Sequence, residues 1–309
     1  MSRSLARSAP VSLVVSILAS ASPALAEPWD QVLTRGSGVL METRVPLPDY
    51  HSVVVKAPLN VEISEGPSDG AQVYLDSNLA DRLRAEVDRG VLTISMAGRS
   101  SHLHKKALVR LRTPTLKSVS ATSTSDVVVL PRKQRAATLE LRVEGTGDLV
   151  WRGGDADALT LAVSGSGDLS GRTRAKTASL HSSGSGETAL QLDVTGVLEL
   201  SQGGSGDIEL SGSFGRIAAV MEGSGDLELQ GSASELTAKL GGSGDLDARK
   251  LTARSVSLVS SGSGEAQVTV RNGPVTAEVS GSGDVTWRGS ATTVKVTTSG
   301  SGRVREAAE

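Results

Sequence analysis

The sequence predicts an all-β protein built as a solenoid of stacked coils, a parallel β-helix with about 19–20 residues per coil. The first observation behind this prediction is a glycine-rich turn, typified by 204–207 (GSGD), which recurs through the C-terminal two thirds of the chain. Successive copies begin 19 or 20 residues apart, a fixed period that is typical of repeat architectures. The copies begin at Gly145, Gly165, Gly184, Gly204, Gly223, Gly242, Gly262, Gly281 and Gly300.

The second observation is that apolar and polar residues alternate on both sides of this turn. The segment 159–163 (LTLAV) precedes one copy, and 226–229 (DLEL) ends another. Alternation with a period of two is typical of a strand with one buried face. The two glycines between the strands permit either a tight bend at positive φ or a close backbone approach. The period is too short for a propeller blade, and the absence of a helical segment argues against a leucine-rich repeat.

Apolar residues also recur at fixed offsets from the turn. Stacking the coils therefore gathers each offset into one buried ladder, with parallel strands about 4.8 Å apart. The column six residues before the first glycine contains Leu139, Leu159, Ala178, Leu198, Ile217, Leu236, Val256, Val275 and Val294. The column four residues after it contains Leu149, Leu169, Thr188, Ile208, Leu227, Leu246, Ala266, Val285 and Val304.

An acidic residue follows the second glycine of almost every copy. The members of this acidic column are Asp148, Asp168, Glu187, Asp207, Asp226, Asp245, Glu265 and Asp284. Carboxylates about 5 Å apart in water repel by roughly 0.8 kcal/mol, so some interaction must offset the repulsion. One interpretation is that each carboxylate accepts hydrogen bonds from turn amides. The alternative is a row of shared cation sites, which makes the column a candidate metal-binding ladder.

The first 26 residues have the pattern of a secretory signal peptide. Arg3 and Arg7 precede a short apolar run, and 24–26 (ALA) is a small-x-small cleavage site between Ala26 and Glu27. The chain has no cysteine, so neither disulfides nor a cysteine-linked lipid anchor are expected. No other long apolar run occurs, and we expect no transmembrane segment in the mature chain.

The remaining chain divides into a linker or loosely docked arm at 27–49, a capping part at 50–126, the repeat region at 127–303 and a tail at 304–309. We expect strands and a hairpin in the capping part, together with a decayed copy of the turn at 123–126 (STSD). Atypical end units are needed to cover the core of a solenoid. The C-terminal edge has little to cover it, which predicts possible pairing with a partner or edge-to-edge self-association.

The composition supports a narrow aliphatic core and limits the partners. Glycine provides 35 of 309 residues and aromatic residues only 2%, while the net charge is −2. Removing Arg3 and Arg7 with the leader brings the charge to about −4, which argues against nucleic acid and anionic membrane surfaces as main partners.

The order of elements resembles the head GIN domain family, which is described as the head of an autotransporter adhesin. The residues that carry the resemblance are 50–56, 59–63, the hairpin ending at 90–94 (GVLTI), 114–116 and the string of GSGD-type turns. The likeness covers about residues 50–303. It implies a right-handed parallel β-helix-like fold in an exported bacterial protein, and it carries over no catalytic residue.

Other candidate sites were weighed against simpler structural roles. His102 and His104 flank one residue and could bind a metal, but neighbouring lysines favour a solvated loop. Trp151 and Trp287 occupy the same repeat offset and could stack on sugars, although leucines at that offset favour core packing. A regular acidic ladder is poor support for catalysis, because acid–base pairs need unlike environments.

The sequence thus predicts a non-enzymatic exported protein of the bacterial cell envelope, periplasmic or on the cell surface, without a cofactor. It would be a scaffold or adhesion module that binds an envelope glycan or a surface protein. The alternatives are a polysaccharide-active β-helix enzyme, as in families that use paired acids, and a cation-stabilised structural protein.

Overall fold

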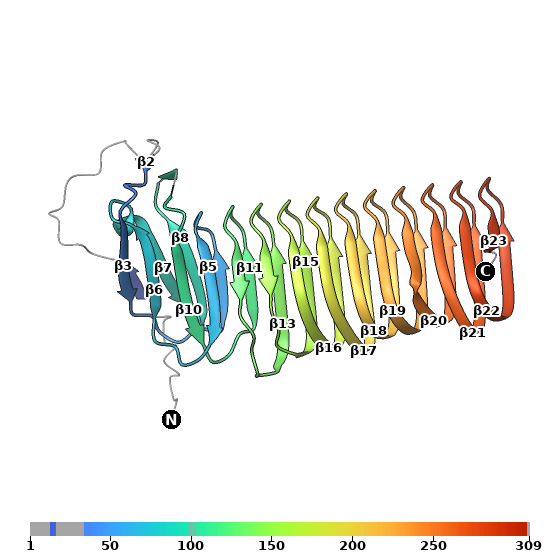
Figure 1. Cartoon of the computed structure of the whole chain (residues 1–309), viewed down its shortest axis with the longest axis horizontal. Coiled ribbons are helices and arrows are strands. Elements are labelled where there is room, and N and C mark those ends of the chain that lie inside the picture. Colours follow the sequence, from blue (N-terminus) through green and yellow to red (C-terminus); the bar gives the residue numbers. More distant parts are fainter. Residues whose placement is uncertain (1–12, 17–33, 99, 102, 308–309) are drawn as a thin grey trace, which may run out of the picture.

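The computed structural model describes residues 13–16, 34–98, 100–101 and 103–307, and it shows one long stack of β-coils (Figure 1). The N-terminal strands form a cap at one end that continues the same sheet, and the glycine turns lie in a row along one edge of the stack. The predicted all-β solenoid is confirmed. The signal peptide, with the cleavage site at Ala26 and Glu27, lies outside the described residues except for four of them, 13–16.

The cap contains short strands and one 3₁₀ turn. The elements are β1 (Leu13–Ser16), β2 (Thr34–Arg35), β3 (Leu40–Val45), β4 (Ser52–Val55), β5 (Asn60–Glu65), β6 (Ala71–Asp76), η1 (Ala80–Arg82), β7 (Leu83–Asp88), β8 (Val91–Met96), β9 (Ser100–Ser101), β10 (Leu108–Thr113), β11 (Ser118–Ala121) and β12 (Val127–Val129). The expected hairpin is formed by β7 and β8, and β11 pairs in parallel with the first repeat strand. Because the stack continues across residue 126, the boundary drawn there remains a prediction.

The repeat region stacks parallel strands in register. The elements are β13 (Ala136–Val143), β14 (Leu149–Trp151), β15 (Ala156–Val163), β16 (Leu169–Ser182), β17 (Thr188–Gln202), β18 (Ile208–Met221), β19 (Leu227–Leu240), β20 (Leu246–Ser260), β21 (Ala266–Val279), β22 (Val285–Thr298) and β23 (Val304–Glu306). Leu210 of β18, for example, lies opposite Leu229 of β19. From β16 to β22 each strand runs unbroken from one glycine turn to the next.

The predicted apolar columns form the core. Leu159, Leu198 and Leu236 of one column are buried, as are Leu149 and Leu227 of the other. Each ladder therefore places identical or similar side chains against one another from coil to coil, which favours dense packing. The exception is the last coil, where Val294 and Val296 are 43% and 44% exposed.

The motif glycines are needed because the turns stack closely, and not because of positive φ. Neither Gly204 nor Gly206 is among the glycines with positive φ. A Cβ on Gly206 would lie 2.1 Å from the carbonyl oxygen of Gly186 in the preceding coil. Of the two roles that the sequence left open, the close backbone approach is the one found.

The segment expected as a linker or loosely docked arm contributes a strand to the cap. β3 pairs with β6 in an antiparallel arrangement. Asp76, which is fully buried at the end of β6, accepts hydrogen bonds from the backbone amides of Gly38 and His104, both at 2.8 Å. The carboxylate therefore fastens the arm and a neighbouring loop to the same strand.

One corner of the solenoid differs from all others. Between β12 and β13 the chain leaves the strand path over 130–135, and between β14 and β15 it does so over 152–155. Later coils pass the same corner as continuous strands. The two irregular connections lie at the lower edge of the green coils beside β13 (Figure 1).

Candidate functional site

The acidic column forms a hydrogen-bonded ladder between coils. In each step the Oδ1 atom of an aspartate accepts the backbone amide of the residue one coil further on. The seven bonds are Asp148 to Asp126, Asp168 to Asp148, Glu187 to Asp168, Asp226 to Asp207, Asp245 to Asp226, Glu265 to Asp245 and Arg303 to Asp284, with N–O distances of 2.7–3.2 Å. Charge-assisted bonds to backbone amides offset the repulsion along the column.

The two glutamates interrupt this ladder. No bond joins the Glu187 carboxylate to the amide of Asp207, or Glu265 to Asp284, within the described residues. A side chain longer by one methylene does not place its oxygen where an aspartate oxygen lies. The ladder thus explains the preference for aspartate. The donor in each bond is a backbone amide of the next coil, and not an amide of the carboxylate's own turn.

No described group of three or more histidines, cysteines, aspartates or glutamates is arranged to hold a metal ion. Six column members are exposed, and Asp148 and Asp284 are half-buried. The amide bonds use one oxygen of most of these carboxylates. The cation-ladder interpretation remains a prediction.

The histidines are scattered. The Nδ1 atom of His51 lies 3.0 Å from the Ser52 hydroxyl, and His104 Nδ1 accepts the backbone amide of Lys106 at 3.1 Å. His102 lies outside the described residues. Trp151 and Trp287 are buried, with 2% and 8% of their surface exposed, so the core-packing interpretation holds for both.

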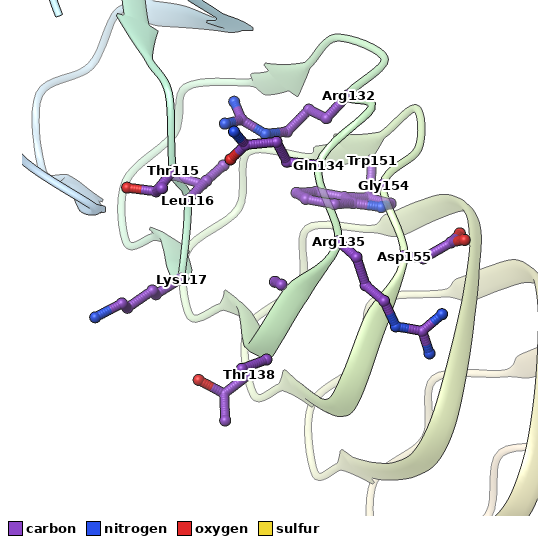
Figure 2. A pocket seen from close by; sticks show the side chains of 12 residues that line it. Thr115, Leu116, Lys117, Arg132, Gln134, Arg135, Thr138, Trp151, Gly154 and Asp155 are labelled. Carbon is purple, nitrogen blue, oxygen red and sulfur yellow. The ribbon is translucent and has the colours of Figure 1, made fainter.

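The irregular corner encloses a small cavity of about 150 Å³ (Figure 2). In this view Arg132 lies above the indole ring of Trp151, Gln134 beside it and Arg135 below. A volume of this size is well above the minimum that a single water molecule needs. The wall comes from the connection after β12, the connection after β14 and residues 115–117, which precede β11.

Two hydrogen-bond donors at this cavity are buried and have no acceptor among the described residues. They are the indole Nε1 of Trp151 and the Nη1 of Arg132. The other terminal nitrogen of Arg132, Nη2, donates to the carbonyls of Thr113 at 2.9 Å and Pro114 at 3.1 Å. Those two bonds fix the guanidinium against the end of β10. A buried donor without a partner costs free energy, so both groups favour an acceptor in the cavity.

Glycines bring the chain close to this indole. Gly154 has a φ of +124°, and a Cβ there would lie 3.1 Å from the Cζ2 atom of Trp151 and 3.3 Å from Cβ of Arg132. Figure 2 shows the indole nitrogen at the ring edge that faces Gly154. Thr173 on the next coil donates from its hydroxyl to the Gly154 carbonyl at 2.7 Å, which holds the connection in place.

A wider depression of about 660 Å³ adjoins the cavity and shares Arg132, Gly154 and Asp155 with it. Five basic and two acidic side chains line it, an excess of three positive charges on a chain whose net charge is −2. The charged residues are Arg132, Lys133, Arg152, Arg172, Arg174, Asp155 and Asp193.

The two acids of the depression are already engaged. Asp155 accepts from the Nε of Arg174 at 3.4 Å, and Asp193 accepts the backbone amide of Ser213 at 2.9 Å. The side chains of Lys133, Arg152 and Arg172 form no ion pair within the described residues and extend into solvent. The depression is therefore positive where it is most accessible.

Burial affects the ionisation of the fixed arginine. Desolvation lowers the pKa of Arg132, opposed by the nearby carboxylate of Glu65 and by Tyr50. An arginine remains charged at neutral pH even so. Desolvation also raises the pKa of Tyr50, whose hydroxyl donates to the Arg112 carbonyl at 3.0 Å. The cavity thus combines the neutral indole donor of Trp151 with the cationic guanidinium of Arg132.

The sequence did not reveal this site. The repeat offset of Trp151 indicates core packing or, if exposed, sugar stacking, but not a buried donor at a cavity, and Arg132 belongs to no motif. The available signal was local: basic residues and glycines are concentrated at 131–135 (PRKQR) and 151–154 (WRGG), where neighbouring coils have strand residues.

Comparison with known proteins identifies the family. The family described as "Putative auto-transporter adhesin, head GIN domain" matches residues 49–210 and 188–291. No curated protein matches the chain. Among the described residues, no helix has the length and hydropathy needed to cross a membrane.

The chain is similar to several solved structures, three of them from Parabacteroides species. A crystal structure from Parabacteroides distasonis, named as a putative lipid binding protein, is 17% identical with a TM-score of 0.50 and covers 90% of this chain and 100% of its own. One named as a putative adhesin from Parabacteroides merdae is 17% identical with a TM-score of 0.49, covering 89% and 99%. A putative adhesin from Parabacteroides distasonis is 20% identical with a TM-score of 0.48, covering 89% and 100%.

Proposed function

This chain belongs to the head GIN domain family, and we propose that it is a non-enzymatic, exported binding protein of the bacterial cell envelope. It acts as an adhesion or scaffold module, in the periplasm or on the cell surface, and its partner is an envelope glycan or a surface protein. The family description and the secretory pattern of residues 1–26 support export.

The observation that carries the non-enzymatic proposal is the uniformity of the acidic column. Its aspartates occupy equivalent positions and form equivalent bonds to the next coil. General acid–base chemistry needs two carboxyl groups whose environments separate their pKa values. A repeated, amide-bonded carboxylate fits a structural role better than either partner of such a pair.

A retention assay tests this function. Purified protein is incubated with peptidoglycan and with polysaccharides extracted from the envelope, and both retained protein and released soluble fragments are measured. We expect retention without fragments. Release of fragments would contradict the non-enzymatic proposal and would favour the polysaccharide-active enzyme. Binding to intact cells that survives removal of glycans would direct the search to surface proteins.

The cation-stabilised alternative has its own test in thermal stability. A ligand that binds only the native state raises the melting temperature by mass action. Equal melting temperatures in calcium and in EDTA are the result expected of the amide-bonded ladder. A rise of several degrees in calcium would favour shared cation sites instead.

A further inference from the structure

The corner at 131–135, 152–155 and 171–174 brings three features together in one place. It has a small cavity, two buried donors without acceptors, and a neighbouring depression with an excess of positive charge. Each missing partner is a hydrogen-bond acceptor, and the surrounding charge favours an anion. We call this region the basic corner.

We propose that the basic corner binds an acidic glycan, with one oxyanion group in the cavity and the adjoining sugar units in the depression. The oxyanion is a carboxylate or a phosphate, whose oxygens accept hydrogen bonds from Trp151 Nε1–H and from Arg132 Nη1–H. This inference rests on the proposed function, since it names the ligand class of an envelope binding protein.

Size and polarity fit such a ligand. A cavity of about 150 Å³ accommodates an acid group but not an oligosaccharide, whereas the depression of about 660 Å³ lies in the usual range of ligand sites. Arg132 is held by the Thr113 and Pro114 carbonyls, so its free nitrogen is already oriented. Orientation before binding reduces the entropy lost on association.

Three exposed cationic side chains line the depression beside this cavity. Lys133, Arg152 and Arg172 come from successive coils and have no competing ion pair in the described part of the chain. Guanidinium groups bind carboxylate and phosphate through paired hydrogen bonds. A linear polymer with an acid on successive sugars therefore meets a positive group on each coil that it crosses.

Other anionic partners fit less well. The large exposed apolar side chains of the described chain are Val39, Met41, Val220, Val259, Val294 and Val296, and none of them lines the depression. An anionic membrane would therefore find charge but no apolar group to insert. No aromatic side chain lines the depression, so it offers no stacking platform for the bases of single-stranded nucleic acid.

The test is calorimetric titration of the full chain with defined probes. Trigalacturonate supplies carboxylates, a sugar phosphate supplies a phosphoryl group, and galactotriose is the neutral control. We expect binding of at least one anionic probe and none of the neutral one, with affinity that falls as salt rises. The tighter of the two anionic probes identifies the source of the oxyanion. Equal binding of galactotriose would overturn the proposal.

Variants place the binding at the basic corner. The exposed pair Arg152→Gln and Arg172→Gln should preserve the fold and weaken binding about tenfold or more, because charge-assisted contacts are lost. Trp151→Phe removes one buried donor, keeps an aromatic ring at the position and should also weaken binding. Trp287→Phe and Arg288→Gln, at the same repeat offset, are matched controls and should leave the affinity unchanged.

Two results would contradict the assignment. The first is unchanged affinity in the Arg152→Gln, Arg172→Gln double variant. The second is binding to vesicles with anionic lipids but not to either anionic sugar. If these variants are still retained by envelope polysaccharide as well as the wild type, the site is wrong but the proposed function stands. If the wild type is not retained at all, the proposed function itself fails.

Discussion

The regular coils and the basic corner are built from the same repeat but differ in what their polar groups do. In coils β17 to β21, the strands run without interruption through the position that corresponds to the basic corner. The aspartates of the acidic column accept hydrogen bonds from the next coil. At the basic corner two connections leave the strand path, and buried donors have no partners. Buried hydroxyls without a partner also occur in the regular coils, at Ser182, Thr188 and Ser260, but none of them lines the positively charged depression. Hydrogen bonds between coils stabilise the solenoid, whereas the unpartnered donors and free cations of the basic corner lie together where a ligand can bind.

The largest effect should come from filling the tightest point of the regular stack. A Cβ on Gly206 would lie 2.1 Å from the Gly186 carbonyl oxygen, whereas one on Gly203 in the same turn would have no atom within 4 Å. We expect Gly206→Ala to cost roughly 1–3 kcal/mol or more of unfolding free energy. Gly203→Ala, the matched control, should stay within about 0.5 kcal/mol.

Denaturant unfolding followed by circular dichroism measures both variants. If Gly206→Ala were as stable as Gly203→Ala, close stacking of the turns would not be what requires glycine. The tight contact between stacked turns would then not be a stability-determining feature of the regular coils.

A smaller effect is expected from the aspartate ladder. The Oδ1 atom of Asp226 accepts the Asp245 amide at 2.8 Å, while Glu187 accepts no amide from the next coil in the described structure. Asp226→Ala should therefore destabilise by about 0.5–1.5 kcal/mol, and Glu187→Ala by much less. Hydrogen exchange at the Asp245 amide reports the bond directly. Equal losses in the two variants would mean that the ladder bonds contribute nothing beyond the turn.

The loss of stability at low pH should differ slightly between the wild type and a variant of Asp247. Hydrogen bonds from Arg249 hold the pKa of Asp247 below its usual value. A depressed pKa adds stability above the unfolded-state value, near 3.9, and that stability is lost as the pH falls through the folded value. Asp247→Asn should thus narrow the gap in stability between pH 6 and pH 2. An unchanged gap would show that this exposed pair contributes nothing.

The smallest difference in stability is expected between two matched tryptophan variants. Trp151→Phe and Trp287→Phe each replace a buried indole by a smaller ring, which should cost about 1–3 kcal/mol in both. Because the Trp151 N–H has no acceptor in the described structure, the two losses should agree within about 0.5 kcal/mol. A loss of sugar binding in Trp151→Phe alone would separate the two regions. A loss that is several kcal/mol larger in Trp151→Phe would show instead that the indole N–H belongs to the structural framework.

Sequence predicted the regular coils well because one period fixes the strands, the turns and the apolar columns together. Leu227 and Leu236 lie where their offsets place them, and the burial of Trp151 followed from leucines at its repeat position. The direction of the aspartate bonds could not be predicted, because a column in sequence does not reveal which coil supplies the amide. The strand at 40–45 was not predicted, because the glycines and prolines on either side of it are typical of a linker.

The basic corner lay beyond sequence analysis for a different reason. Arg132 is oriented by carbonyls of Thr113 and Pro114, which belong to the non-repeating cap. No period connects those residues, and only the folded chain brings them together. Departures from a repeat are visible in sequence, but the partners they lose or gain are not.

The most direct test of the central claim is to locate a bound acidic sugar in a crystal of the protein soaked with trigalacturonate. We predict density for a carboxylate in the cavity, within hydrogen-bonding distance of Trp151 Nε1 and Arg132 Nη1, and sugar density along Arg152 and Arg172. Density along the regular faces or beside the acidic column would contradict the account. So would an empty basic corner at a concentration that saturates the protein in solution.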